Sequence, residues 1–355
     1  MNAPYAKRIV AKWLLGALFG TFLIAFTSPL FVRSYVPSRL DPLRGVVVLQ
    51  SGHLYRWRSE GYATTATGPH GMPGRTSLPE TKPLPETKSA GVIRIAIWGD
   101  SQAEGVGVAD EQKLHRQIER IAEQSKQTIV ALPLARSGDD AADWLAQIPR
   151  VEEALSIDMH VILVAEMVDL EAATAAIDES PEVDPKQLAA QNRIASNVPA
   201  FVIQAVRRVL RTPDDTPRKL RFSVGPIKSE PQPAAIPETQ KTDWHTVMQT
   251  IRSASDRPIL LLYSPRIQRK SLTSIVVDDD QPTGSDLAKI KQAAQAAEIR
   301  LHDVTEQLVD SAENNQWPHG FHNGIIMQGH LNVTGYAIIA SEIVSEIELF
   351  DFPVH

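Results

Sequence analysis

Hydrophobic and polar positions divide the chain into an N-terminal apolar segment and a larger region of alternating strand-like and helix-like patterns. The run WLLGALFGTFLIAFTSPLFV at 13–32 contains no charged side chain. Its length matches the hydrocarbon core of a bilayer. The run ends in bulky residues and not at a small-residue cleavage site, which favours an uncleaved anchor over a signal peptide. We therefore expect an N-terminal tail at 1–12 and one transmembrane anchor at 13–32.

Basic residues flank this segment equally on both sides, so charge alone does not orient it. They are Lys7, Arg8 and Lys12 before the run and Arg33, Arg39 and Arg44 after it. The preceding tail is short and nearly all of the chain follows the run. We expect the tail to stay inside and the main domain to be exported.

Residues 33–91 form an extension and a spacer rather than a domain of their own. GVVVLQSGHLYRW at 45–57 alternates enough to predict a strand pair or a short strand. LPETKPLPETK at 78–88 repeats one five-residue unit around Pro83. Its prolines favour an extended chain, which is typical of a spacer.

From residue 92 to 350, short apolar runs alternate with helical patterns. The strand-like runs lie at 92–98, 128–135, 159–168, 257–265 and 299–304, and the helix-like ones at 110–127, 141–148, 284–298 and 334–349. This alternation predicts a three-layer α/β/α fold with a mostly parallel sheet. The segment 212–240 is rich in proline and charge. We expect it to be an insertion within the domain.

The composition of the chain excludes some classes of binding partner and some kinds of metal site. The formal net charge is −6, so the chain lacks the basic field that a nucleic-acid-binding protein needs. It has no cysteine, which excludes disulfides and thiolate metal sites. Hydrophobic residues make up 43% of the chain, enough for a large core.

Candidate chemistry begins in IRIAIWGDSQAEGVGV at 93–108, where an apolar strand runs into Gly-Asp-Ser. The motif places Ser101 at the carboxyl end of a strand, where open parallel sheets bind ligands. Ser101 is therefore a candidate nucleophile, although a plain strand-to-turn junction has the same pattern. A nucleophilic serine needs a base. His330, in QGHLNVTGY before the last predicted helix, is the candidate, with a surface histidine in a helix-entry loop as the alternative.

Two further histidines, His319 and His322, precede His330 in WPHGFHNG. The three lack a helical i, i+4 pair and a clear carboxylate ligand, so we expect no metal site. No nucleotide-binding motif is present in the sequence. We expect no cofactor.

Three blocks in this order resemble the SGNH (GDSL) hydrolase family. IWGDSQAEGVGV is similar to the first block, ARSGDDAADWL to the second and QGHLNVTGY to the last. The preceding segment YATTATGPHGMPG is similar to the segment before the nucleophile strand in exported, membrane-anchored members of the family. These members include proteins that act with membrane-bound O-acyltransferases on envelope polysaccharides. The resemblance implies a protein of a bacterial inner membrane, crossing it once, with its main domain in the periplasm.

The resemblance also implies roles for individual residues. Ser101 would be the nucleophile, His330 its base, and the backbone amides of Ser101 and Gly138 the oxyanion donors. The sequence departs from the family in two places. Val168 precedes Asp169 where the third block carries an oxyanion-binding Asn, and Gln328 and Met327 stand where an Asp precedes the histidine. Gln328 would orient the histidine through its carbonyl oxygen, unless the site is a Ser-His dyad or takes a carboxylate from Asp169 or Asp303.

These observations lead to two functional hypotheses. The first is an esterase or O-acyltransferase that acts on acyl esters of envelope glycans, with an acylated glycan as substrate and a membrane-bound O-acyltransferase as partner. The alternative is a catalytically weakened SGNH-like domain that binds a glycan or serves as a scaffold in a membrane complex. The missing Asn and Asp favour the alternative.

Overall fold

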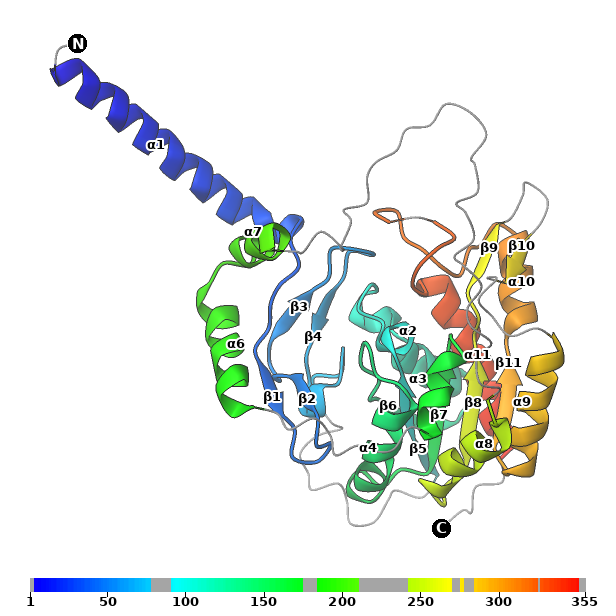
Figure 1. The fold of residues 1–355 in the computed structure, drawn as a ribbon. Coiled ribbons are helices and arrows are strands. Elements are labelled where there is room, and N and C mark those ends of the chain that lie inside the picture. The colour runs from blue at the N-terminus through cyan, green and yellow to red at the C-terminus, as the bar shows by residue number, and fades with distance from the viewer. Residues whose placement is uncertain are drawn as a thin grey trace.

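The computed structural model describes residues 3–77, 91–174, 184–210, 242–269, 275–277, 284–324 and 326–350. The spacer expected at 78–88 and the insertion expected at 212–240 lie outside these residues. The first element, α1 (Ala3–Thr27), is followed by the short turn η1 (Ser28–Leu30) and projects away from the rest of the chain (Figure 1). A helix this long and apolar can cross a membrane, and a signal sequence meets the same criteria.

Two small hairpins follow the helix. The first pairs β1 (Ser38–Leu40) with β2 (Val47–Leu49), and the second pairs β3 (Leu54–Arg56) with β4 (Thr64–Ala66). The expected strand-like stretch at 45–57 therefore contains β2 and β3, which pair with other strands and not with each other. The short turn η2 (Pro69–Gly71) follows the second hairpin.

Five parallel strands form the central sheet in the order β11-β8-β7-β5-β6. They are β5 (Val92–Gly99), β6 (Thr128–Pro133), β7 (Met159–Val164), β8 (Ile259–Tyr263) and β11 (Arg300–Asp303). The chain moves from β5 to one side for β6 and to the other side for β7. Ligand sites of open parallel sheets lie at such a reversal, beyond the carboxyl ends of the strands. The residues that follow β5 stand there.

Helices cover both faces of this sheet, which confirms the expected three-layer α/β/α class (Figure 1). One face carries α4 (Ala141–Ala154), α8 (Trp244–Ser253) and α9 (Gly284–Ala296), and the other carries α3 (Leu114–Gln124), α10 (Thr305–Glu313) and α11 (Val333–Glu348). The remaining elements are α2 (Ser101–Glu104), η3 (Asp110–Gln112), α5 (Val168–Glu171), η4 (Ala172–Thr174), α6 (Pro185–Asn197), α7 (Ala200–Leu210) and the pair β9 (Ile267–Arg269) and β10 (Ile275–Val277).

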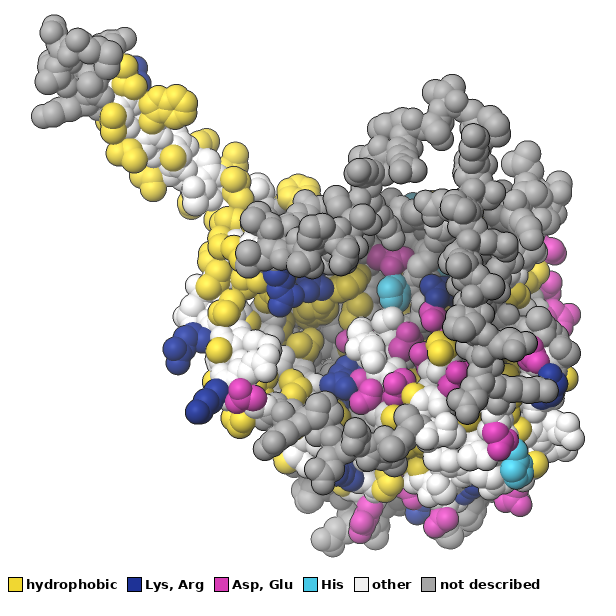
Figure 2. Space-filling model, viewed as in Figure 1, with side chains coloured by type: hydrophobic (Ala, Val, Ile, Leu, Met, Phe, Trp, Pro, Cys, Tyr) yellow, Lys and Arg dark blue, Asp and Glu magenta, His cyan; other side chains and the backbone are white. Residues whose placement is uncertain are grey.

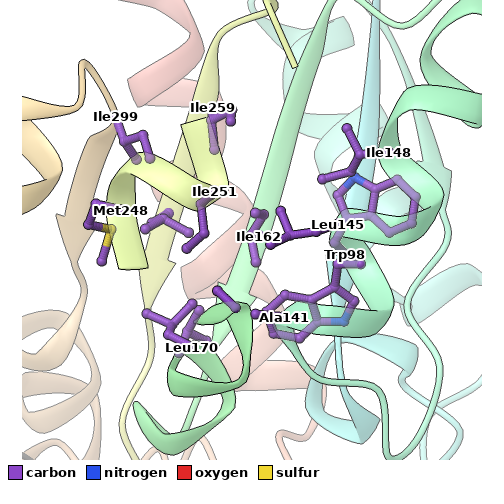
Figure 3. Close-up of a cluster of buried hydrophobic side chains, with 14 of the residues drawn as sticks. Trp98, Ala141, Leu145, Ile148, Ile162, Leu170, Met248, Ile251, Ile259 and Ile299 are labelled. Atoms are coloured by element: carbon purple, nitrogen blue, oxygen red, sulfur yellow. The ribbon is translucent and has the colours of Figure 1, made fainter. Parts of the chain in front are cut away.

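Side chains along β5 alternate between two hydrophobic cores, one on each face of the sheet. Ala96 and Trp98 point into the layer of α4 and α8, while Ile95 and Ile97 point into the layer of α3 and α11. Figure 3 shows the first of these layers, where side chains of α4 and α8 meet those of the sheet. A strand buried on both faces is built mainly from apolar residues, which explains the continuous run IAIW.

The extension docks on the core through buried arginines. Arg44 is 2% exposed, and its guanidinium donates to Gln147 Oε1 at 2.8 Å, to the His70 carbonyl at 3.0 Å and to the Leu134 carbonyl at 2.6 Å. Arg75 pairs with Glu119 of α3 at 2.7 Å. Burying a charge is tolerated only where its donors are satisfied. These contacts place the extension in a defined position on the core.

Candidate active site

Ser101 lies at the first position of the one-turn helix α2, directly after β5. Gly99 ends the strand at φ +143°, and a Cβ there would lie 2.7 Å from the Leu163 carbonyl oxygen. Only glycine fits this turn without strain. Asp100 caps α2 by accepting from the Gln102 amide at 2.8 Å. The sharp turn therefore presents the Ser101 hydroxyl at the carboxyl edge of the sheet.

His330 lies in the loop before α11, and Gln102 ties this loop to α2. The Gln102 side chain accepts from the Leu331 amide at 2.9 Å and donates to the Gly329 carbonyl at 3.5 Å. These two hydrogen bonds hold the residues on either side of His330. Tyr336 of α11, which is fully buried, donates its hydroxyl to the Gln102 carbonyl at 2.6 Å. The loop that carries the histidine is thus attached to the helix that carries the serine.

The structure brings Ser101 and His330 together, although 229 positions separate them in the sequence. Their Oγ and Nε2 atoms are 3.0 Å apart. This separation is within hydrogen-bond reach, the geometry that general-base activation of a hydroxyl needs.

Glu60 of the extension contacts the other ring nitrogen of His330. Its Oε2 lies 2.5 Å from Nδ1, and its Oε1 accepts from the His330 backbone amide at 3.0 Å. Gly329 makes the approach possible, since a Cβ there would lie 1.7 Å from Oε1. Ser101, His330 and Glu60 therefore form one hydrogen-bonded chain.

The motifs of the sequence do not single out Glu60. It lies in RWRSEGYA of the extension, before the first of the three family-like blocks. The hairpin pattern around it signals a folded segment, but no pattern in the sequence marks which of the chain's many carboxylates reaches His330.

Arg58 holds the loop between β3 and β4 that carries Glu60. Its Nη1 donates to the Trp57 carbonyl at 2.7 Å and to the Ala63 carbonyl at 2.5 Å, and its Nε donates to the Pro29 carbonyl at 3.2 Å. The guanidinium also lies 4.3 Å from the centroid of the Tyr62 ring. The Glu60 loop is therefore attached to η1, at the end of the apolar helix.

The core holds the other side of the same loop. Asn323 donates its side-chain amide to the Gly61 carbonyl at 2.7 Å. Gly61 has φ +75°, and a Cβ there would lie 2.1 Å from the Gly107 carbonyl oxygen. This close backbone approach requires glycine at position 61.

The hydrogen bond from Glu60 raises the pKa of His330 above its ordinary value, and this effect outweighs the lowering by burial. The charges of Glu60 and Asp100 act in the same direction, whereas Arg266 opposes them. The site thus stabilises an imidazolium, the form that the histidine takes after it accepts a proton from a hydroxyl.

The carboxylates and the amide that the sequence suggested for this role lie elsewhere. Gln328 is exposed, and Nδ1 of His330 contacts Glu60 in its place. Asp303 accepts from Lys291 at 3.0 Å and from the Thr305 amide at 3.1 Å. Asp169 lies near Asp100, and burial, helped by the charges of Asp100, Glu166 and Asp140, raises its pKa to about 7.

Gly138 lies in an exposed loop after β6, at φ +84°. The neighbouring Ser137 binds Glu104 of α2: its backbone amide donates to Oε2 at 2.9 Å, and its hydroxyl donates to the same oxygen. Arg136 donates to the Val47 carbonyl of β2 at 2.8 Å and pairs with Asp139. The loop with the expected oxyanion donor is therefore tied to the serine helix and to the extension.

The end of β7 carries no amide side chain. The strand is followed by Ala165, Glu166 and Met167, and Glu166 pairs with Arg266. Val168 begins α5 and is 60% exposed. The third-block Asn expected from the family thus has no counterpart among these residues.

His319 and His322 do not join His330 in a metal-like cluster. His319 is 1% exposed, and its pKa falls to about 4, chiefly through burial. His322 is exposed. The described residues contain no group of three His, Asp or Glu side chains arranged to hold a metal ion.

No family model and no curated protein matches the sequence. Solved structures that align with this chain include an acetyl xylan esterase, AlAXEase, at 14% identity and a TM-score of 0.39, covering 72% of this chain and 100% of that one. A variant of Axe2, an acetyl xylan esterase from Geobacillus stearothermophilus, is 11% identical with a TM-score of 0.39, covering 74% and 97%. A GDSL-like lipase from Bacteroides thetaiotaomicron is 13% identical with a TM-score of 0.32, covering 72% and 87%.

Proposed function

We propose that this protein is a serine ester hydrolase in which Ser101, His330 and Glu60 form the catalytic triad. The observation that carries the proposal is the continuous hydrogen-bonded chain from the Ser101 hydroxyl through both nitrogens of His330 to Glu60. Such a chain supplies a nucleophile, a base and a carboxylate that orients the base and stabilises its charged form.

The reaction follows from the placement of these groups. Ser101 Oγ attacks the ester carbonyl while His330 Nε2 takes its proton. The backbone amides of Ser101 and Gly138 donate to the developing oxyanion. The imidazolium then gives the proton to the departing alcohol, which leaves Ser101 acylated. Water, activated by His330 in the same way, attacks the acyl-enzyme and releases the acid and the free serine.

Within this proposal the apolar helix anchors the enzyme to the inner membrane with its main domain in the periplasm, and the substrates are acylated glycans of the envelope. If a glycan hydroxyl replaces water in the second step, the same residues catalyse O-acyl transfer. A membrane-bound O-acyltransferase is the partner that this second reaction would need as its acyl source.

The alternative hypothesis is a catalytically weakened binding module. It depended on the absence of two residues of the family pattern. Glu60 contacts the ring nitrogen of His330 that the Asp of the family pattern would contact. This contact favours an active enzyme. The other missing residue is the oxyanion-binding Asn. Its absence lowers the expected turnover by roughly 10²- to 10³-fold relative to a site that has it.

Labelling with a fluorophosphonate probe tests the proposal, because the probe reacts only with an activated serine. We expect the detergent-purified full-length protein to be labelled at Ser101. Labelling should disappear in Ser101→Ala and His330→Ala and weaken strongly in Glu60→Gln. Glu313→Gln, which changes an exposed glutamate of α10, is the matched control. Equal labelling of the wild type and Ser101→Ala would refute the assignment.

A further inference from the structure

A cavity of about 210 Å³ lies between the extension and the core, beside the candidate active site. The extension contributes Val47, Tyr55 and Trp57 to its wall, and the core contributes Glu104, Arg136 and Ser137, among others. Figure 2 shows a hollow in this region, with hydrophobic side chains inside it and Lys or Arg side chains nearby.

The position of the cavity relates it to the reaction proposed above. Glu104 lies in the same one-turn helix as Ser101, and Ser137 directly precedes Gly138. Ser137 lines the cavity, so the cavity borders the loop that carries Gly138, the proposed oxyanion donor. A group bound here would adjoin an ester held at Ser101.

The walls combine aromatic surface with free hydroxyl groups. Tyr55 and Trp57 are half-buried neighbours with ring centroids 6.1 Å apart. Burial raises the pKa of the Tyr55 hydroxyl to about 12, so the group remains a hydrogen-bond donor at neutral pH. Within the described part of the chain, neither this hydroxyl nor that of Ser38, which also lines the cavity, has a hydrogen-bond partner.

The arginines of the cavity already bind other groups of the protein. Nε, Nη1 and Nη2 of Arg44 all donate to other groups of the protein. Arg136 is engaged by Asp139 and by the Val47 carbonyl. Glu104 adds a negative charge to the wall. A phosphate or carboxylate ligand would therefore meet the Glu104 carboxylate beside arginines that already bind groups of the protein.

An acyl chain suits the cavity less well than a polyol does. It would cover the hydroxyls of Tyr55 and Ser38 without hydrogen-bonding to them, and burying unsatisfied polar groups costs free energy. A sugar ring presents apolar C–H faces to aromatic rings and hydroxyls to polar groups. The cavity is also smaller than the roughly 300 Å³ at which pockets for drug-sized ligands begin, so it holds one ring and not an oligosaccharide.

We propose that this cavity is a subsite for one neutral sugar ring of an acylated glycan, with Tyr55 and Trp57 as its contact surface. The inference rests on the proposed function, because the ring is part of the ester that Ser101 attacks. It adds a role for the extension, which then supplies both the triad carboxylate and the substrate contact.

Kinetics of sugar and non-sugar esters test the subsite. The substrates are partially acetylated xylo-, cello- and chito-oligosaccharides, with 4-nitrophenyl acetate as the ester without a sugar. For Tyr55→Phe, we expect the ratio of kcat/KM on the preferred sugar ester to that on 4-nitrophenyl acetate to fall roughly fivefold to tenfold, through loss of one hydrogen bond. Trp57→Ala should lower the ratio at least as far.

Tyr35→Phe is the matched control, because it removes the hydroxyl of a half-buried extension tyrosine that does not line the cavity. It should leave the ratio unchanged. An unchanged ratio in Tyr55→Phe and Trp57→Ala would overturn the subsite, as would a preference for 4-nitrophenyl octanoate over every acetylated sugar.

Binding without turnover separates this proposal from the proposed function. Saturation-transfer NMR of the full-length Ser101→Ala protein with the deacetylated oligosaccharides should show contacts that Trp57→Ala, added to it, abolishes. Sugar binding with no hydrolysis of any ester by the wild type would uphold the subsite and overturn the hydrolase. Hydrolysis of 4-nitrophenyl acetate with no sugar binding would overturn the subsite and uphold the hydrolase.

Discussion

Glu60 and His330 are 270 positions apart, yet Oε2 of the one lies 2.5 Å from Nδ1 of the other. The extension that carries Glu60 is therefore part of the candidate active site. A protein shortened to the family-like blocks alone would keep Ser101 and His330 but lose the carboxylate that orients the histidine.

Glu60→Gln should lower kcat on 4-nitrophenyl acetate by roughly 10³- to 10⁴-fold, the scale seen when a triad carboxylate becomes an amide. The amide cannot stabilise the imidazolium, and its NH₂ group can favour the wrong tautomer. Steady-state kinetics measure the effect, with Glu313→Gln as the control. A loss of less than tenfold would mean that Glu60 is not the triad carboxylate.

The pH profile should reflect the same contact. His330 acts as a base only when neutral, so the rate rises as pH increases through its pKa. The hydrogen bond with Glu60 raises that pKa, and Glu60→Gln should therefore shift the rising limb of kcat/KM to lower pH. Profiles between about pH 5 and pH 9 would show the shift. A limb that stays in place or moves to higher pH would contradict the assigned role.

Gln328→Asp should leave the activity within about twofold of the wild type, because Glu60 already contacts Nδ1 and position 328 is exposed. The same change should not restore activity to Glu60→Ala. Rescue of Glu60→Ala by Gln328→Asp would show that position 328 reaches the histidine after all.

Arg58→Ala should lower kcat by roughly tenfold or more, since the loop that positions Glu60 loses three hydrogen bonds and the contact with Tyr62. The rising limb of the pH profile should move in the same direction as in Glu60→Gln, which a general loss of stability would not cause. Arg39→Ala, an exposed arginine of the same extension, is the control and should retain the wild-type profile. An unaltered profile in Arg58→Ala would exclude the positioning role.

Arg44→Met should destabilise the protein by about 2–4 kcal/mol, because it leaves the buried Leu134 carbonyl and the buried Gln147 side chain without their donor. Denaturant unfolding in detergent measures the loss. Arg39→Met, whose ion pair with Asp41 is largely exposed on the arginine side, should cost less than about 1 kcal/mol. Equal stabilities of the two variants would show that Arg44 does not hold the extension in place.

The amino-acid sequence alone predicted the α/β/α class and the turn that carries Ser101, and its resemblance to a family suggested His330 as the base. The largely apolar run at 92–98 and its successors specify buried parallel strands, because strands covered on both faces are built mainly from apolar residues. Gly99 before Asp100 and Ser101 marks a turn that only glycine permits. These signals are local, so they can be read without knowing where distant segments lie.

Which carboxylate contacts His330 depends on how the extension packs on the core, and the sequence patterns do not predict this packing. Glu60 reaches the histidine because Arg44 docks the extension on the core, Arg58 holds the loop, and Gly329 leaves space for the carboxylate. Gln328, adjacent in sequence to that glycine, points elsewhere and is exposed. A contact across 270 positions depends on how separate elements pack, and hydrophobic periodicity describes each element only by itself.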